Sequence, residues 1–373
     1  MRRRAPNDRR AASRSRRTDG HPSTFGVFRS TFVERVVDHG RVHGRGCRCC
    51  TAVPSGPGTP RGSVRRRQPV PDPARYPMRP GGFLPSVSVC IPVYNGETYL
   101  AETIRSVLAQ SWRDFELVIL ENNSSDASWQ IATSFRDPRI RLERNRETLP
   151  QGDNWNRAVQ LCRAPLVKLV CADDLLHPRC LELQVPPMRD DPALALVASR
   201  RHMIDEQSRV LVPRRGLGGG LVGLHSGSEV ARRVIRNGAN PIGEPGNVLF
   251  RQEQFVTAGG WRPERRFIMD LDLWMRLLQY GDFLGVPETL AAFRIARGSV
   301  SSEYEQQISD EQQLLLDELG GSGVFDVRPL DVRIGRVAMP LGRARRRALF
   351  KVSRLAARKD EKVIAEQQEA ASG

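Results

Sequence analysis

Apolar residues along the middle of the chain gather in short runs that are separated by polar and turn-forming residues. In the intervening segments they recur at helical spacing. Leu100, Ile104 and Val107, for example, stand at i, i+4 and i+7 and predict one face of an amphipathic helix. Strands that alternate with helices in this way predict an α/β fold with a mostly parallel, doubly wound sheet flanked by helices. The runs that predict strands lie at 87–93, 115–120, 140–142, 166–171, 194–198 and 248–250.

The same pattern predicts further helices near 129–132, at 155–162, at 270–280 and at 303–318. Residues 200–245 are rich in Gly and Arg and show no sustained period, so we expect an irregular surface segment there, one that could serve as a lid in the sense of a mobile loop over a site. Ligands of such sheets bind at the carboxyl ends of the strands. Glu121 and the pair Asp173–Asp174 follow two predicted strands, so we expect them to face one crevice.

The two ends of the chain differ from its middle in composition. Residues 1–80 are rich in Arg, Pro, Gly and Ser and lack both structural periods, which predicts a disordered extension. Met78 stands just before the first predicted strand, so an over-extended gene start is an alternative. The expected organisation is therefore an Arg-rich extension over 1–80, a central α/β domain over 84–302 and a helical basic C-terminal extension over 303–373.

The net charge of +16 lies in these ends. Residues 1–80 hold 19 Arg residues against five acidic residues, whereas residues 81–330 are mildly acidic. An Arg-rich arm that binds nucleic acid stays an alternative, but such arms interleave aromatic residues, which are nearly absent here, so we do not expect a nucleic-acid partner. The basic stretch 341–365 suits a helix on an anionic membrane surface or, equally, a solvated terminal helix.

The chain contains neither of the apolar segments that would take it into or across a membrane. No apolar run reaches the roughly 18–20 residues of a membrane-spanning helix. The N-terminus lacks the apolar stretch of a secretory signal. We expect a cytoplasmic protein, peripheral at the inner face of the plasma membrane if its C-terminal helix binds lipid. The seven Cys residues show no regular pairing and are expected to be reduced thiols.

Two acidic clusters are candidates for chemistry. Adjacent carboxylates such as Asp173 and Asp174 at a strand end suit a hard divalent cation, Mg²⁺ or Mn²⁺, although they also suit a helix N-cap. Asp270 and Asp272 begin a predicted helix, where acids stabilise the first turn and where one of them could act as a general base. Lys168, inside a predicted strand, either contacts a phosphate or extends to the surface.

Five segments of the chain, in this order, resemble the inverting glycosyltransferases of family 2, which have the GT-A fold. The resemblance covers roughly 84–302. The segments are SVCIPVYNGETYL through NNSSD within 87–126, NWNR at 154–157, LVKLVCADD at 166–174, GNVLFRQEQFVTAGGW at 246–261 and MDLDLWMRLLQYG at 269–281.

The resemblance implies transfer of a sugar from a nucleotide-diphosphate sugar to a hydroxyl of a glycan, polysaccharide or lipid-linked acceptor, by in-line displacement. It implies that Asp173, with Asp174 beside it, binds the divalent ion that bridges the diphosphate, and that Asp270 deprotonates the acceptor hydroxyl. The positions that match the family's nucleotide-sugar site, besides Asp173, are Pro92, Tyr94, Asn95, Glu97, Glu121, Asn122 and Asn156.

The chain departs from the family pattern at three positions. Cys171 stands where the aspartate signature usually begins, Met269 replaces the acid that often precedes the catalytic aspartate, and Ala296 occupies a place where many relatives carry a histidine. A thiol is a poor ligand for Mg²⁺ and a better one for softer metals. These departures keep open a second hypothesis, a degenerate protein that binds a sugar nucleotide without turning it over.

Overall fold

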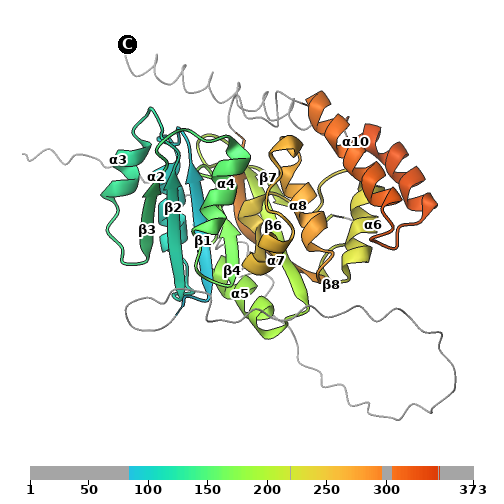
Figure 1. Ribbon diagram of the computed structural model, residues 1–373, viewed down its shortest axis with the longest axis horizontal. Coiled ribbons are helices and arrows are strands. Elements are labelled where there is room, and N and C mark those ends of the chain that lie inside the picture. The colour runs from blue at the N-terminus through green and yellow to red at the C-terminus, as the bar shows by residue number, and fades with distance from the viewer. Residues whose placement is uncertain (1–83, 219, 296–304, 343, 345–373) are drawn as a thin grey trace, which may run out of the picture. The chain divides into compact units, whose positions relative to one another are not determined.

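The computed structural model describes residues 84–218, 220–295, 305–342 and 344 (Figure 1). The expectations for 1–80, for Ala296 and for most of 341–365 lie outside these residues. Within them, no helix is both long enough and apolar enough to cross a lipid bilayer.

The strands form one mixed sheet in the order β3-β2-β1-β4-β9-β6-β10-β5, with β7 paired to β6 and β8 paired to β10. Strands β3, β2, β1 and β4 pair in parallel, as do β6 and β10, and β9 runs antiparallel between the two groups. The expected α/β class with a largely parallel sheet is therefore confirmed. The bounds are β1 Val87–Val93, β2 Phe115–Glu121, β3 Ile140–Arg144, β4 Leu166–Leu169, β5 Leu175–Leu176, β6 Leu194–Ile204, β7 Val210–Arg215, β8 Gly223–His225, β9 Val248–Arg251 and β10 Asp282–Arg294.

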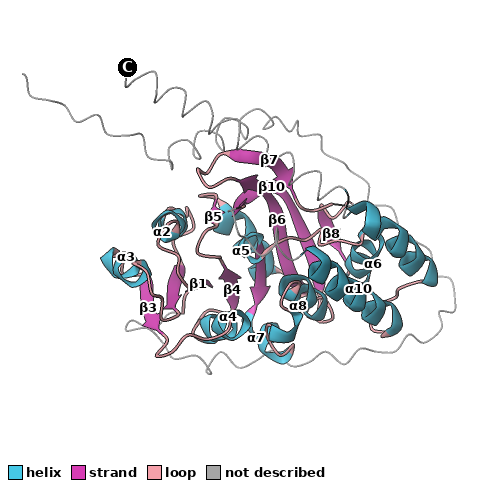
Figure 2. Cartoon of the chain, turned by 90° about the horizontal axis from the view of Figure 1, so that it is seen from above, coloured by secondary structure: helices cyan, strands magenta, loops and turns pink. Residues whose placement is uncertain are grey.

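Helices cover both faces of the sheet (Figure 2). Every residue of β1 and β2 is buried, as expected where a parallel sheet is covered on both sides. Side chains of β1 alternate between two apolar clusters: Ile91 packs with Ile104 of α2, whereas Cys90 packs with Val159 of α4. The helices are α2 Leu100–Leu108, α3 Ser128–Ser134, α4 Gln151–Gln160, α5 Cys180–Asp190, α6 Gly227–Asn237, α7 Gln252–Thr257, α8 Met269–Leu277 and α10 Glu305–Gly321, with short 3₁₀ turns at Pro245–Asn247 and Pro263–Arg265 and a further helix over 329–342.

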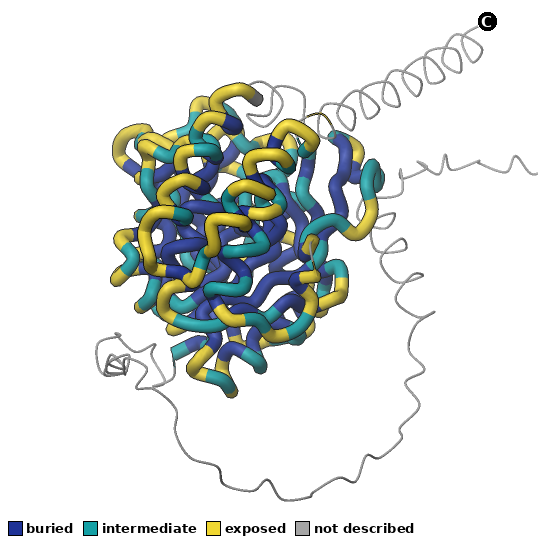
Figure 3. Tube along the Cα trace, turned by 90° about the vertical axis from the view of Figure 1, so that its right-hand side faces the viewer, coloured by how far each residue is buried: buried dark blue, intermediate teal, exposed yellow. Residues whose placement is uncertain are grey.

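The cluster under α8 is aromatic. Trp261 and Trp274 are almost completely buried, and their rings meet edge to face at 5.5 Å. Phe250 and Phe255 stack beside them at 5.6 Å. Both tryptophans therefore pack in the core. Figure 3 shows the buried strands inside a shell of partly exposed helices.

The expectation of an irregular segment over 200–245 was wrong for most of that range. It contains the end of β6, the strands β7 and β8, and the helix α6. Ser226 caps α6 by accepting the N–H of Glu229 at 3.2 Å, and Gly238 ends it in the left-handed conformation at φ 55°. Those two end signals were present in the sequence, but the many Gly and Arg residues around them obscured the helical period.

Both expectations for Lys168 were wrong as well. Its side chain is completely buried, and Nζ donates a hydrogen bond to the carbonyl oxygen of Val248 at 3.1 Å. Burial lowers the pKa of this ammonium. Lys168 therefore joins β4 to β9 inside the sheet and does not reach a phosphate or the surface.

The helix over 329–342 packs on α6 at a close approach that requires glycine. A Cβ at Gly335 would overlap with the carbonyl oxygen of Ile235, whereas a Cβ at Gly342 would meet nothing within 4 Å. We expect Gly335→Ala to lower the free energy of unfolding by about 1–3 kcal/mol through overpacking. The matched change Gly342→Ala should leave stability equal or slightly higher. Urea denaturation of both variants tests this packing, and equal stabilities would contradict it.

Candidate functional site

The turn after β1 and the end of β2 form one edge of the site. Val93 and Glu121 are paired residues at the carboxyl ends of these parallel strands. The backbone N–H of Asn122 donates to the carbonyl oxygen of Val93 at 2.8 Å. The structure therefore brings Tyr94 to Glu97 beside Glu121 and Asn122, as expected from their places in the sequence.

Most polar groups of the turn over 94–97 hold the neighbouring loop over 124–128. Asn95, at φ 47°, donates its N–H to Ser124 Oγ at 3.0 Å and accepts the N–H of Ser125 at 3.0 Å. Glu97 Oε2 accepts the N–H of Ala127 at 2.9 Å. Pro92 is buried in β1, whereas Tyr94 is 55% exposed. The ring of Tyr94 is therefore exposed on a turn that these hydrogen bonds hold in place.

Glu121 is completely buried, yet its carboxylate is paired. Oε2 lies 2.7 Å from Nε of Arg144, and Oε1 accepts the N–H of Ser124 at 2.5 Å. The guanidinium of Arg144 also lies over the ring of Trp129, 5.0 Å from its centroid. Glu121 therefore carries a negative charge at this edge that is balanced by a partly exposed arginine.

A chain of three amides lies behind Asn122. Asn122 Oδ1 accepts a hydrogen bond from Asn145 Nδ2 at 2.7 Å, and the same Nδ2 donates to Asn154 Oδ1 at 2.9 Å. Asn122 also holds both the N–H and the carbonyl oxygen of Leu149, each at 2.9 Å. Sequence reasoning missed Asn145 as the partner of Asn122 and Asn154 as the partner of Asn145.

The side chain of Asn156 binds the protein backbone, whereas the resemblance implied a contact with the nucleotide sugar. Its Nδ2 donates to the carbonyl oxygen of Trp261 at 2.8 Å, and its Oδ1 accepts the N–H of Trp261 at 2.7 Å. Both polar ends of the side chain are used in this pairing. Asn156 therefore fixes the segment that leads into α8.

Cys171, Asp173 and Asp174 form a compact group after β4. One ligand atom of each, the thiol sulfur and a carboxylate oxygen from both acids, lie within 4.8 Å of one another. Burial raises the pKa of Asp174 well above its usual range, and the neighbouring charge of Asp173 adds to this. Burial and the same acids raise the pKa of the Cys171 thiol. A bound cation would relieve the cost of two carboxylates placed so close together.

Arg294, at the end of β10, organises this acidic group. It is almost completely buried; its backbone N–H donates to Asp174 Oδ1 at 3.1 Å, and its Nε donates to the carbonyl oxygen of Asp173 at 2.9 Å. Nη2 donates to Glu102 at 2.9 Å, and the guanidinium lies 4.2 Å from the ring centroid of Tyr99. Sequence reasoning missed Arg294 because each of these partners lies on another element.

Asp270 lies in the first turn of α8. Its Oδ1 accepts the N–H of Leu271 at 2.8 Å, and its Oδ2 accepts a hydrogen bond from Asn240 Nδ2 at 2.9 Å. Burial raises the pKa of this carboxyl to about 7, with a further rise from Glu244 and an opposing effect of Arg201. A carboxyl with a pKa near neutrality is suited to accept a proton.

The loop over 240–247 runs between Asp270 and the acidic pair. Asn240 contacts Asp270 at one end, and at the other a Cβ on Gly246 would lie 3.4 Å from Asp174 Oδ2. Between them Glu244 forms a two-point ion pair with the buried Arg201, whose Nη2 lies 2.7 Å from Glu244 Oε1. Asn240, Glu244 and Arg201 were not predicted, because they fall in the range that was expected to be irregular.

Asp272, only two residues from Asp270, is placed differently. Its side chain is buried, and its Oδ2 accepts hydrogen bonds from Nε and Nη2 of Arg276 at 2.9 and 2.7 Å. Arg262 lies on its other oxygen at 3.6 Å. The two acids in the first turn of α8 therefore have different contacts. Asp272 pairs with Arg276 within the helix, and Asp270 faces the loop over 240–247.

The comparison with protein families matches residues 88–256 to the model described as glycosyl transferase family 2. The match begins in β1 and ends in α7, so it covers both the edge formed by β1 and β2 and the acidic group of Cys171, Asp173 and Asp174.

Two curated relatives extend over more of the chain. An uncharacterized protein of Mycobacterium tuberculosis, MT1568, is 29% identical over 243 residues, which are 62% of this chain and 75% of that protein. EpsE of Bacillus subtilis, whose name marks it as a candidate glycosyltransferase, is 27% identical over 223 residues, or 58% of this chain and 74% of that protein.

Among solved structures, TarS 1-349 of S. aureus in complex with UDP-GlcNAc matches with a TM-score of 0.52 and 16% identity, over 68% of this chain and 71% of that one. This likeness supports the GT-A fold. The family match shows that the chain contains a glycosyl transferase family 2 domain over residues 88–256.

Proposed function

We propose that this protein is an inverting glycosyltransferase that moves a sugar from a nucleotide-diphosphate sugar to a hydroxyl of a glycan, polysaccharide or lipid-linked acceptor. The observation that carries the proposal is the loop over 240–247, which borders Asp270 at one end and Asp174 at the other. An in-line displacement needs a base and a site for the diphosphate close to one reacting carbon, and this loop borders a candidate for each.

On the donor side, the exposed ring of Tyr94 and the edge formed by Glu121 and Asn122 are proposed to take the nucleoside. Asn95, Glu97 and Pro92 would act by holding the turn rigid, since their polar groups or rings are already engaged in it. We propose for Asn156 a positioning role, because both ends of its amide bind the backbone of Trp261.

The acidic group fits a divalent cation. Asp173 and Asp174 offer hard oxygen ligands, and their burial in the same small space leaves charge for a cation to balance. Mg²⁺ or Mn²⁺ held there would act as a Lewis acid toward the charge that develops on the diphosphate. The Cys171 thiol adds little to such a site, because a thiol is a poor ligand for Mg²⁺.

On the acceptor side, Asp270 would take the proton of the attacking hydroxyl. Its hydrogen bonds with the N–H of Leu271 and with Asn240 fix both oxygens of the carboxylate, so the base is oriented before the acceptor arrives. We also propose that the protein works at the cytoplasmic side of a membrane, which would bring it to lipid-linked acceptors.

Calorimetry with the full chain tests the proposal. UDP is the first nucleotide to try, because the matched TarS structure contains UDP-GlcNAc, and GDP is the second, each with and without Mn²⁺. We expect metal-dependent binding of one of them and turnover of the corresponding sugar nucleotide. Binding without turnover under any divalent metal would instead support the degenerate protein that the departures at Cys171 and Met269 suggest.

The raised pKa of Asp270 predicts how transfer depends on pH. A base is active when it is deprotonated, so the rate should rise as the pH increases through about 7 and fall about tenfold per unit below it. A bound divalent cation favours the carboxylate, so the midpoint should lie at or below this value. The pH profile of kcat measures it, and a rate that increases toward low pH would exclude Asp270 as the base.

A further inference from the structure

The helix over 329–342 carries an apolar stripe that no other described residue covers. Leu330, Ile334, Val337 and Leu341 stand at i, i+4, i+7 and i+11, which places them on one side of an α-helix. Their side chains are 59%, 38%, 69% and 69% exposed. Four large apolar residues in a row on the surface of one helix are uncommon unless something binds there.

The opposite side of the same helix is fixed to the protein. Asp331 is completely buried and forms an ion pair with Arg236 of α6. Gly335 lies against the carbonyl oxygen of Ile235, and the buried Met339 contacts Gly238. The helix therefore cannot rotate to bury its stripe without losing these contacts, and the stripe stays directed outward.

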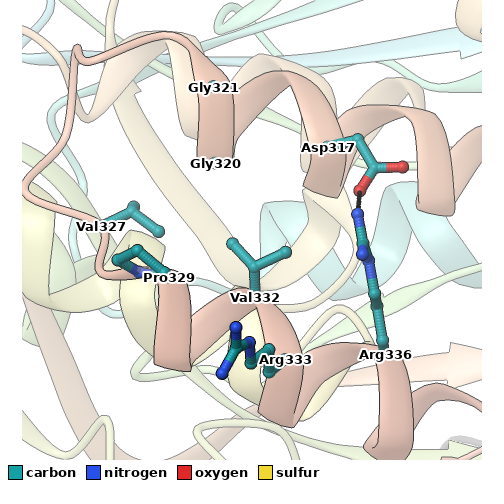
Figure 4. A pocket seen from close by; sticks show the side chains of 8 residues that line it. All are labelled: Asp317, Gly320, Gly321, Val327, Pro329, Val332, Arg333 and Arg336. Carbon is teal, nitrogen blue, oxygen red and sulfur yellow. Dashed lines mark hydrogen bonds and ion pairs between the residues drawn. The ribbon is translucent and has the colours of Figure 1, made fainter.

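Positive charge borders the stripe. Arg333 and Arg336 line a hollow of about 410 Å³ between α10 and the helix, and Arg336 lies 3.3 Å from Asp317 of α10 (Figure 4). Beyond Gly342 the sequence continues with Arg at position 343 and at positions 345–347. The chain is therefore basic both beside the stripe and just beyond the end of the helix.

Protein partners already engage three acidic residues of α10, and one of these pairs involves Arg336, so Arg333 is the arginine that supplies charge beside the stripe. Glu318 pairs with Arg265, Asp317 with Arg336, and Glu311 accepts the N–H of Phe267.

We infer that the stripe formed by Leu330, Ile334, Val337 and Leu341 binds the surface of an anionic phospholipid membrane, with Arg333 at the headgroup phosphates. An apolar row bordered by arginines is the arrangement of a helix that lies in the membrane interface. Arginine can keep its aliphatic part against the acyl chains while its guanidinium remains at the phosphates.

A second copy of the chain fits this surface less well. Two such helices face to face would bring Arg333 of both copies together, and like charges at an interface oppose association. Anionic lipid supplies the opposite charge. The inference does not depend on the transfer activity, since the stripe lies outside the site that holds Asp270 and Asp174.

Flotation of the full chain with vesicles tests the inference, with phosphatidylcholine vesicles that contain phosphatidylglycerol compared with phosphatidylcholine alone. We expect binding to the anionic vesicles and a loss of at least about tenfold in affinity for the double variant Val337→Gln, Leu341→Gln. Arg333→Gln should lose about fivefold. The matched control is Leu224→Gln, Val256→Gln, which removes two equally exposed apolar side chains elsewhere and should bind like the wild type.

Three results would overturn the inference. The first is no vesicle binding by the wild type, as expected if another part of the chain covers the stripe. The second is equal binding by the stripe variant, which keeps every Arg at both ends of the chain and would assign binding to those ends. The third is a dimer in sedimentation velocity without lipid that the stripe variant disrupts. UDP binding, measured on the same variants, should be unchanged, so a failure here is distinct from a failure of the donor site.

Discussion

Replacing Asp270 by Asn should lower the rate of sugar transfer by about 10²–10⁴-fold while leaving nucleotide binding within about twofold. The amide cannot accept a proton. Its one oxygen can keep the hydrogen bond from the Leu271 N–H, whereas the acceptor that faces Asn240 Nδ2 is lost. Since burial already raises the pKa of this carboxyl to about 7, a neutral group at this place costs the fold little. Steady-state kinetics, calorimetric binding of UDP and the melting temperature together measure the effect.

The matched comparison is Asn240→Ala, which removes the donor to Asp270 Oδ2 but keeps the base. We expect it to reduce kcat less than Asp270→Asn does and to shift the pH profile toward higher pH, because a hydrogen bond to the carboxylate is lost. An equal loss of transfer and of nucleotide binding in Asp270→Asn would contradict the role of base and would assign Asp270 to the donor site.

The sequence was sufficient for the half of the sheet that holds β1 to β4. β1 and β2 are buried on both faces, so they occur as continuous apolar runs that are easily recognised. β10 was not predicted, although it is the longest strand described. Pro287 and Glu288 interrupt its pattern where its register to β6 shifts, and such a bulge looks like a turn in a sequence.

The site residues also fall into two groups, those that the local sequence identifies and those that meet only in the folded chain. Glu121, Asp173 and Asp270 stand next to the end of a strand or the start of a helix, so their neighbours along the chain identify them. Arg201 and Glu244 are 43 residues apart and meet only in the folded chain. The contact between the Arg294 N–H and Asp174 spans 120 residues, so no local pattern could reveal it.

Asp272→Ala should act on stability where Asp270→Asn acts on rate. Removing this carboxylate leaves the buried guanidinium of Arg276 without its ion-pair partner, which we expect to lower the free energy of unfolding by about 3–5 kcal/mol. Arg276 would retain only its hydrogen bonds to the carbonyl oxygens of Ala258 and Gly260. Urea denaturation measures the loss, and protein that remains folded should still bind UDP.

Two further variants isolate the cause. In the double variant Asp272→Ala, Arg276→Met, part of the lost stability should return, because the uncompensated charge is gone. Asp190→Ala removes an acid of an exposed pair with Arg189 and should leave the urea midpoint unchanged. If Asp272→Ala instead kept the wild-type midpoint and lost transfer, the base would be Asp272. The assignment of the two acids of this helix would then be reversed, because a carboxylate that compensates the buried Arg276 is not the one that takes a proton from the acceptor.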